Sequence, residues 1–171
     1  MNKYFKSITV LFSICLVVSL LLALINFITT PIIEETKLKA ETKSLVEVLP
    51  EAGDFEKVEL TDNVPETVNA IYKDTKGTGY AITLATSSQY SSSDMLISVG
   101  IGSDGVIKGI KITAYTESKD IGDDYPQSFV GKDSSLSGID IVAGVTYSSN
   151  AFKDAIKDAF TGLDAVGIQF N

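Results

Sequence analysis

Histidine, tryptophan and arginine are absent from this chain of 171 residues, and it has a single cysteine, Cys15. Without histidine, neither a Ser-His-Asp triad nor a histidine-ligated haem or zinc site can form. One cysteine excludes an internal disulfide and a cysteine-ligated iron–sulfur cluster. Without arginine, bidentate clamping of a phosphate or carboxylate is not available. If the chain does redox chemistry, an organic cofactor must supply it.

The charge balance is acidic. The chain has 14 lysines against 22 acidic residues, a formal net charge of −8 and a sequence pI of about 4.5. Lys3 and Lys6 precede a long uncharged segment, so the remainder of the chain is more acidic still. Such a surface repels the phosphate backbone of a nucleic acid. We therefore expect no nucleic-acid partner.

A long apolar run lies near the N-terminus. No charged residue occurs from Ser7 to Ile33, and residues 8–28 are dominated by Leu, Ile, Val and Phe. Crossing a bilayer core of ~30 Å takes roughly 20 apolar residues in a helix. The run therefore predicts a transmembrane helix at residues 7–30, with a break at Pro31. The alternative, a cleaved signal peptide, has a shorter apolar core and an A-x-A-like cleavage site, which this run does not show.

The two lysines before the run predict its orientation. Positively charged flanks stay on the cytoplasmic side, so the N-terminus is expected in the cytoplasm and the rest of the chain on the outer, extracytoplasmic face of the cell membrane. The expected parts of this single-pass protein are a cytoplasmic N-terminus at 1–6, a transmembrane helix at 7–30, a stalk helix at 31–52 and a further domain at 53–171. The stalk is predicted from apolar residues that recur at helical spacing between 34 and 49.

The region 53–171 has the pattern of an α+β domain. Residues rich in β-branched and aromatic side chains predict strands at 68–73, 80–86, 95–101 and 106–113. Ser103-Asp104-Gly105 predicts a hairpin turn between the last two. A short helix is predicted at 125–130 and a longer amphipathic one at 148–160, closed by Gly162. Strands followed by helices predict an antiparallel sheet with packed helices.

The sharpest local pattern is segment 140–146, Asp-Ile-Val-Ala-Gly-Val-Thr, which runs into the predicted helix at Ser148. The pattern predicts a turn with a flexible glycine that exposes the Thr146 hydroxyl at a helix N-terminus. Backbone N–H groups there lack intrahelical partners and attract anions, so a phosphate on Thr146 would be stabilised. Gly-x-Thr before a helix is also the ordinary pattern of a turn with a hydroxyl cap. The residues alone leave both interpretations open.

This segment resembles the flavinylation motif of the FMN-binding domain family, in which an aspartate is followed by a few residues, then by a small residue and Gly-Ala-Thr. Residues 115–122, Tyr-Thr-Glu-Ser-Lys-Asp-Ile-Gly, resemble the His-x-Glu-Thr-Pro-Gly-Leu-Gly segment of that family. Residues 129–132, Phe-Val-Gly-Lys, resemble its Phe-x-Gly-Lys. The chain departs from the usual residues at four positions, which are Ala143, Val145, Tyr115 and Lys119.

The resemblance implies a cofactor and its attachment point. Thr146 would carry FMN through a phosphoester, made by a flavin transferase that moves FMN from FAD with magnesium. The implied site residues are Thr146, Gly144, Val145, Asp140, Glu117, Gly122, Tyr147 and Ser148. Gly144 would form the turn, Asp140 would be read by the transferase or help to position magnesium, and Glu117 and Gly122 would shape the flavin pocket. Tyr147 would either stack on the ring or belong to the core, and no resident metal site is expected.

Within the family, the chain is most similar to G subunits of Rnf-type ion-translocating ferredoxin:NAD oxidoreductases, with C subunits of sodium-pumping NADH:quinone reductases second. The implied function is electron transfer within such a membrane complex, whose other subunits would be partners. The chain would be an electron-carrying subunit and not a complete enzyme. Two alternatives stay open, namely a flavin carrier of another extracellular electron-transfer or regulatory system, and a membrane-anchored interaction module without a cofactor.

Overall fold

The computed structural model describes residues 8–23, 43–89, 91, 93–115 and 119–170. The chain divides into two compact units, Met1–Glu41 and Thr42–Asn171. In the first unit, residues 8–23 form a helix whose large apolar side chains are exposed, Ile8 by 65%. Among the described residues, no helix combines the length and the hydropathy required to cross a membrane. The predicted span at 7–30 and the predicted stalk lie partly outside the described residues.

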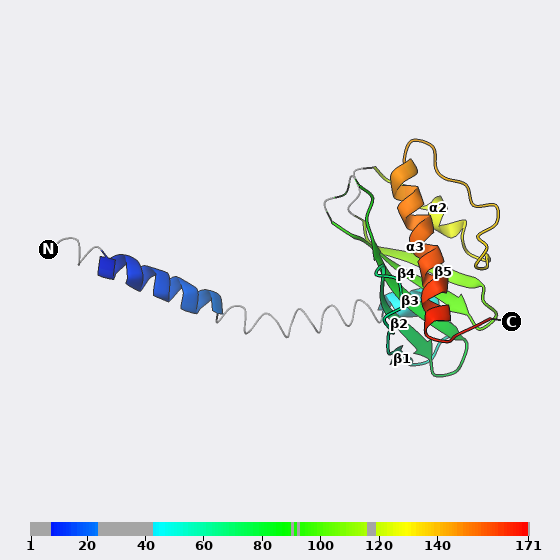
Figure 1. Ribbon diagram of the computed structural model, residues 1–171, viewed down its shortest axis with the longest axis horizontal. Helices are drawn as coiled ribbons and strands as arrows, with labels where there is room; N and C mark the ends of the chain where they lie inside the picture. Colours follow the sequence, from blue (N-terminus) through cyan, green and yellow to red (C-terminus); the bar gives the residue numbers. More distant parts are fainter. Residues whose placement is uncertain (1–7, 24–42, 90, 92, 116–118, 171) are drawn as a thin grey trace. The chain divides into compact units, whose positions relative to one another are not determined.

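The second unit is built on one five-stranded antiparallel sheet (Figure 1). The strands pair in sequence order, and they are β1 (Phe55–Val58), β2 (Val68–Asp74), β3 (Gly79–Thr86), β4 (Met95–Gly102) and β5 (Ile107–Ala114). This order is a simple meander, because each strand returns beside its predecessor through a local turn. The turn between β4 and β5 contains Gly105 at φ +73°, with its N–H bonded to the Gly102 carbonyl. The predicted hairpin is thus confirmed.

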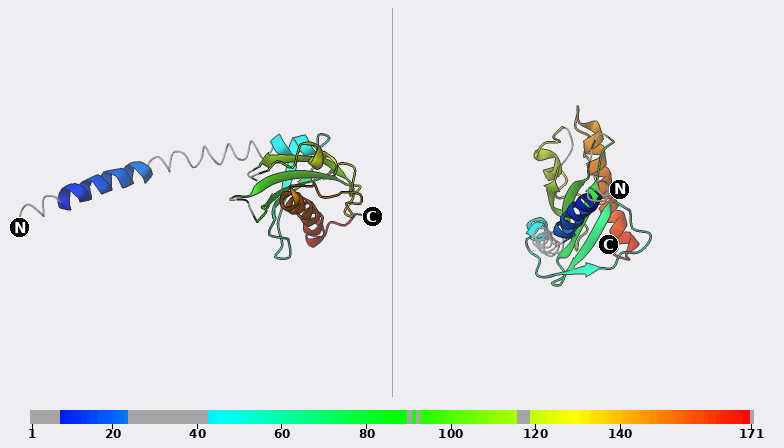
Figure 2. Two further views of the ribbon diagram at one scale, coloured as in Figure 1. Left: turned by 90° about the horizontal axis from the view of Figure 1, so that it is seen from above. Right: turned by 90° about the vertical axis from the view of Figure 1, so that its left-hand side faces the viewer.

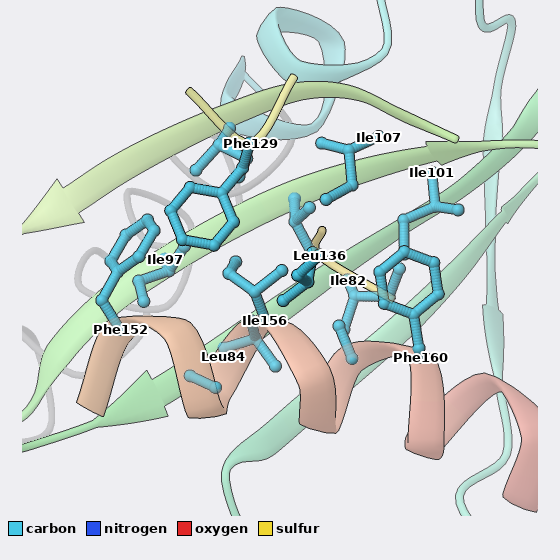
Figure 3. Packing of buried hydrophobic residues seen from close by; sticks show 14 of the residues in the cluster. Ile82, Leu84, Ile97, Ile101, Ile107, Phe129, Leu136, Phe152, Ile156 and Phe160 are labelled. Carbon is cyan, nitrogen blue, oxygen red and sulfur yellow. The ribbon is translucent and has the colours of Figure 1, made fainter. Parts of the chain in front are cut away.

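One face of the sheet is covered by the long helix α3 (Thr146–Ala165). Phe152, Ile156 and Phe160, spaced four residues apart, point from α3 toward the strands (Figure 3). They pack with inward-facing strand residues such as Ile82 and Ile97, both 1% exposed or less. This spacing places the three side chains on one helix face, and burying that face holds α3 across the sheet.

The opposite face of the sheet carries a short helix at residues 43–48 (Figure 2). Leu45 and Val48 of this helix are buried against Ala81 of β3. Because successive strand residues point to opposite faces, Ala81 meets the short helix while its neighbour Ile82 meets the α3 side. The sheet is therefore sandwiched between a long helix and a short one.

The predicted α+β class and the four predicted strands are confirmed, each strand to within one residue at either end. Strand β1 was not predicted, since its sequence Phe-Glu-Lys-Val is short and half polar. The short helix α2 (Asp124–Gln127) begins one residue before the prediction and ends three residues earlier.

The prediction that Gly162 closes the long helix is wrong. Gly162 is buried inside α3, where a β-carbon would lie 3.2 Å from Cγ2 of Val68 on β2. Its small size allows the helix to approach the sheet. The helix ends after Ala165, where Gly167 has φ +83° and the N–H groups of Gly167 and Ile168 bond the carbonyls of Asp164 and Leu163. This is a Schellman end.

Candidate functional site

Thr146 is the first residue of α3, and its side chain is exposed. It follows a turn in which Gly144 has φ +86° and the Val145 N–H bonds the Val142 carbonyl at 3.3 Å. The left-handed conformation at Gly144 favours glycine, since a β-carbon strains the backbone there. The turn thus presents the Thr146 hydroxyl to solvent at the start of a helix of 20 residues.

The N-terminus of α3 has electrostatic features that suit an anion. Val145 stands at the cap position and makes no side-chain cap hydrogen bond, and the first turn contains no acidic residue. The N-terminal end of a helix carries a partial positive charge and N–H groups without intrahelical partners. A phosphate attached to Thr146 would therefore be stabilised at this position.

Two buried groups fix this end of the helix. The hydroxyl of Ser149, which is fully buried, donates to the Val145 carbonyl at 2.9 Å. The Tyr125 hydroxyl, in turn, donates to the Ser149 carbonyl at 3.2 Å. Burial, followed by the charge of Asp154, raises the pKa of Tyr125, so this phenol stays protonated and remains a donor. The first turn of α3 is held from behind while Thr146 faces outward.

A groove of about 800 Å³ lies between β5 and the segment that leads into α2. Its walls include Ile112 and Tyr115 from the strand side and Asp120, Gly122 and Gln127 from the other side. Ligand pockets for small molecules and cofactors have volumes of roughly 300–1,000 Å³, so the groove is large enough for a ring system of flavin size. Apolar and polar side chains both line it, as such pockets require.

The groove segment and the turn before Thr146 are in direct contact. Lys119 stands immediately before the groove residue Asp120, and its Nζ donates to the Gly144 carbonyl at 3.4 Å. The Tyr115 hydroxyl donates to the Lys119 carbonyl at 2.5 Å. The groove wall and the turn that carries Thr146 are thus joined through one lysine side chain.

The site residues expected from the sequence have different surroundings. Gly144 and Val145 lie in the turn that leads into α3, and Thr146 and Tyr147 are its first two residues; Tyr147 is 53% exposed. Ser148 is buried behind them.

Asp140 is exposed, six residues before Thr146. Gly122 lines the groove and has φ +80°. Glu117 lies outside the described residues. Among the described residues, no cluster of acidic or cysteine side chains could hold a metal ion.

Sequence reasoning missed two lysines and one serine at this site. Lys153 belongs to the face of α3 that was expected to be solvated, yet its Nζ donates to the Ile139 carbonyl at 2.5 Å. Lys119 was noted only as a departure from the family pattern. Ser149 had no sequence signal at all, since serine in the first turn of a helix is common. All three act on backbone carbonyls, whose positions only the folded chain defines.

Comparison with known proteins identifies relatives of the region that contains this site. Residues 90–161 match the FMN-binding domain family. The chain is 33% identical over 131 residues to the G subunit of the Na(+)-translocating ferredoxin:NAD(+) oxidoreductase complex from Acetobacterium woodii. That match covers 69% of this chain and 63% of the relative, so the chain spans less than two thirds of the relative's length. The groove, the turn and Thr146 all fall within residues 90–161, and this region is a member of the FMN-binding domain family.

Proposed function

We propose that this chain is an electron-carrying flavoprotein subunit of a membrane-bound ion-translocating oxidoreductase complex, and that its FMN is bonded to Thr146 through a phosphoester. The observation that carries the proposal is the exposed hydroxyl of Thr146 at the start of α3, inside the region that matches the FMN-binding domain family. The similarity to a component of a ferredoxin:NAD(+) oxidoreductase complex supports the choice of complex.

The residues around Thr146 fit such a group. The N-terminus of α3, where Val145 makes no side-chain cap hydrogen bond and no acid stands in the first turn, suits the phosphate. The groove between β5 and α2 has the size for an isoalloxazine ring. Tyr147, exposed beside the attachment point, offers an aromatic surface. When bound, the FMN supplies one-electron and two-electron transfer, and the protein supplies position and electrostatics.

The attachment reaction is a phosphoryl transfer in which Thr146 is the acceptor. Thr146 Oγ1 forms a bond to the phosphorus of the FMN moiety while the pyrophosphate bond of FAD breaks. AMP leaves, and the hydroxyl proton passes to the transferase or to solvent. The hydroxyl must be reachable by another protein for this step, and the exposure of Thr146 meets that requirement.

Membrane attachment belongs to the same proposal. The helix at residues 8–23 has no charged residue and exposes its apolar side chains, which supports an anchoring role for the uncharged run 7–33. In the arrangement we propose, the anchor keeps the flavin domain on the outer face of the cell membrane, within reach of the other subunits of the complex.

The deciding experiment is co-expression of the full chain with a flavin transferase, beside the variants Thr146→Val and Thr161→Val. Thr161 is a matched control, because it is also an exposed threonine on α3. We expect a band that fluoresces under ultraviolet light on a denaturing gel, with a mass gain of FMN less one water, in the wild type and in Thr161→Val. Thr146→Val should show neither.

A known acceptor protein in the same cells shows that the transferase is active. If the wild-type chain then gains no mass, covalent attachment is refuted. Non-covalent binding would still colour the native protein, whereas a colourless protein would point to an interaction module without a cofactor.

A further inference from the structure

Two lysines from different parts of the chain donate hydrogen bonds to segment 140–146 or to the residue just before it. Lys153 of α3 donates to the Ile139 carbonyl at 2.5 Å, just before the segment begins. Lys119, which immediately precedes the groove residue Asp120, donates to the Gly144 carbonyl at 3.4 Å, two residues before Thr146. Segment 140–146 is therefore held near both of its ends by ammonium groups from outside it.

The two contacts differ in strength. Lys153 is half-buried and its hydrogen bond is short. Lys119 is exposed, and its hydrogen bond is near the upper limit of length. The contact from Lys119 also uses only one of three N–H donors and is directed at a neutral oxygen. An anion that arrived nearby would attract the Lys119 ammonium more strongly than the Gly144 carbonyl does.

The site has few other sources of positive charge. The chain contains no arginine or histidine. The Lys153 ammonium donates to the Ile139 carbonyl, and Lys111 forms an ion pair with Glu47 at 2.9 Å. The residue after Lys119 is the acidic Asp120, whose carboxylate accepts the Gly122 N–H at 3.0 Å. A phosphoester on Thr146 would therefore have Lys119 as the lysine that already reaches the preceding turn.

We propose that Lys119 is a positioning residue of the flavin site. Before FMN is attached, its ammonium donates a hydrogen bond to the Gly144 carbonyl; after attachment, the same ammonium donates instead to an oxygen of the phosphoester. This inference rests on the proposed attachment to Thr146. It assigns a role to a side chain whose contact with the turn before Thr146 is seen only in the folded protein.

The first test is the rate of FMN incorporation into the full chain by a purified transferase with FAD and magnesium. We expect Lys119→Met and Lys119→Gln to be modified about tenfold more slowly than wild type, the usual effect of losing one charge-assisted hydrogen bond. Lys119→Arg should retain most of the rate because it keeps the positive charge. Lys157→Met is the control, since Lys157 lies on α3 and pairs with Asp154 at 3.5 Å.

The second test is the phosphorus NMR resonance of the flavinylated chain. We expect the phosphoester resonance to move in Lys119→Met and Lys119→Gln, and to stay in place in Lys157→Met. A role limited to bracing the turn would be partly rescued by the glutamine, which can still donate to Gly144. It would also leave the phosphorus resonance unchanged once FMN is attached.

The outcomes separate the two proposals. If wild type is flavinylated and every Lys119 variant matches it in rate and in phosphorus resonance, the role of Lys119 is refuted while attachment to Thr146 stands. If wild type itself takes up no FMN beside an active transferase, attachment is refuted and the role of Lys119 with it.

Discussion

Gly100 of β4 and Gly109 of β5 are cross-strand partners, and the carbonyl oxygen of Val48 packs against both. A β-carbon on Gly100 would lie 2.2 Å from this oxygen, and one on Gly109 would lie 2.7 Å from it. The helix at residues 43–48 therefore reaches the sheet only because two side chains are missing. A hydrogen bond between the hydroxyls of Ser44 and Ser98, at 2.9 Å, adds to the contact.

The glycine pair predicts a large effect of one methyl group. We expect Gly100→Ala to lower the free energy of unfolding by about 1–3 kcal/mol, the usual cost of overpacking, because the obstacle is backbone. Gly53→Ala is the matched control, since a β-carbon there meets the flexible end of Lys76. Urea unfolding of the two variants beside wild type measures the difference. Equal stability of Gly100→Ala and wild type would show that helix 43–48 does not depend on this contact.

Asp74 at the end of β2 is a fully buried carboxylate that joins two turns. It accepts hydrogen bonds from the Gly53 N–H at 2.7 Å, the Thr78 N–H at 2.9 Å and the Thr78 hydroxyl at 2.6 Å. Burial by itself would raise the pKa of Asp74, but the hydrogen bonds from Thr78 and Gly53 outweigh it and hold the pKa well below its usual range. The ionised form is therefore the one that stabilises the fold.

This pKa predicts an acid-dependent loss of stability. The folded pKa is below the unfolded value of about 3.9, so the contribution is complete above pH ~4 and is lost as the pH falls toward the folded pKa. We expect Asp74→Asn to cost about 1–3 kcal/mol at pH 7 and to show a weaker pH dependence than wild type between about pH 4 and pH 2.5. Asp62→Asn, at an exposed position, is the control. Parallel stability curves for Asp74→Asn and wild type below pH ~4 would contradict this assignment.

Gly144 and Gly77 allow backbone strain to be separated from site chemistry. They have φ +86° and +78°, and at each position a β-carbon would meet nothing within 4 Å. Alanine at either should therefore cost about 1–2 kcal/mol through left-handed strain alone. We expect only Gly144→Ala to slow FMN incorporation, because only Gly144 shapes the turn before Thr146. Similar rates for the two variants in a transferase assay would mean that the turn geometry is not what the transferase reads.

The proposed topology predicts which residues are accessible from outside the cell. Cys15 is the only cysteine, so Cys15→Ala provides a background for new ones. In spheroplasts, a membrane-impermeant maleimide should label Ser134→Cys, which lies at an exposed position of the flavin domain, without permeabilisation. Asn2→Cys should react only after permeabilisation. The reverse labelling pattern would show that the chain has the opposite orientation in the membrane. Loss of the chain from alkali-washed membranes would refute the proposed membrane anchor.

Much of the fold was predictable because its signals are local. Strands β2 to β5 have β-branched and aromatic residues in short runs, and Gly105 marks the turn between the last two. The end of α3 was misplaced because a glycine near the end of an apolar stripe usually terminates a helix. In the folded protein Gly162 instead lies where α3 meets Val68, a contact between distant parts of the chain that no local pattern contains.

The sequence by itself determined the acidic charge, the uncharged N-terminal run and the segment 140–146 that resembles a flavinylation motif, because each is a property of the residues themselves and of their order. Only the tertiary structure decided that Thr146 is exposed at a helix start fixed by Tyr125 and Ser149, and that Lys119 reaches the turn before it. The groove beside Gly122 likewise exists only once β5 and α2 are packed. The physical reason is that hydrogen bonds to backbone carbonyls and the walls of a groove depend on residues that folding brings together from distant parts of the chain.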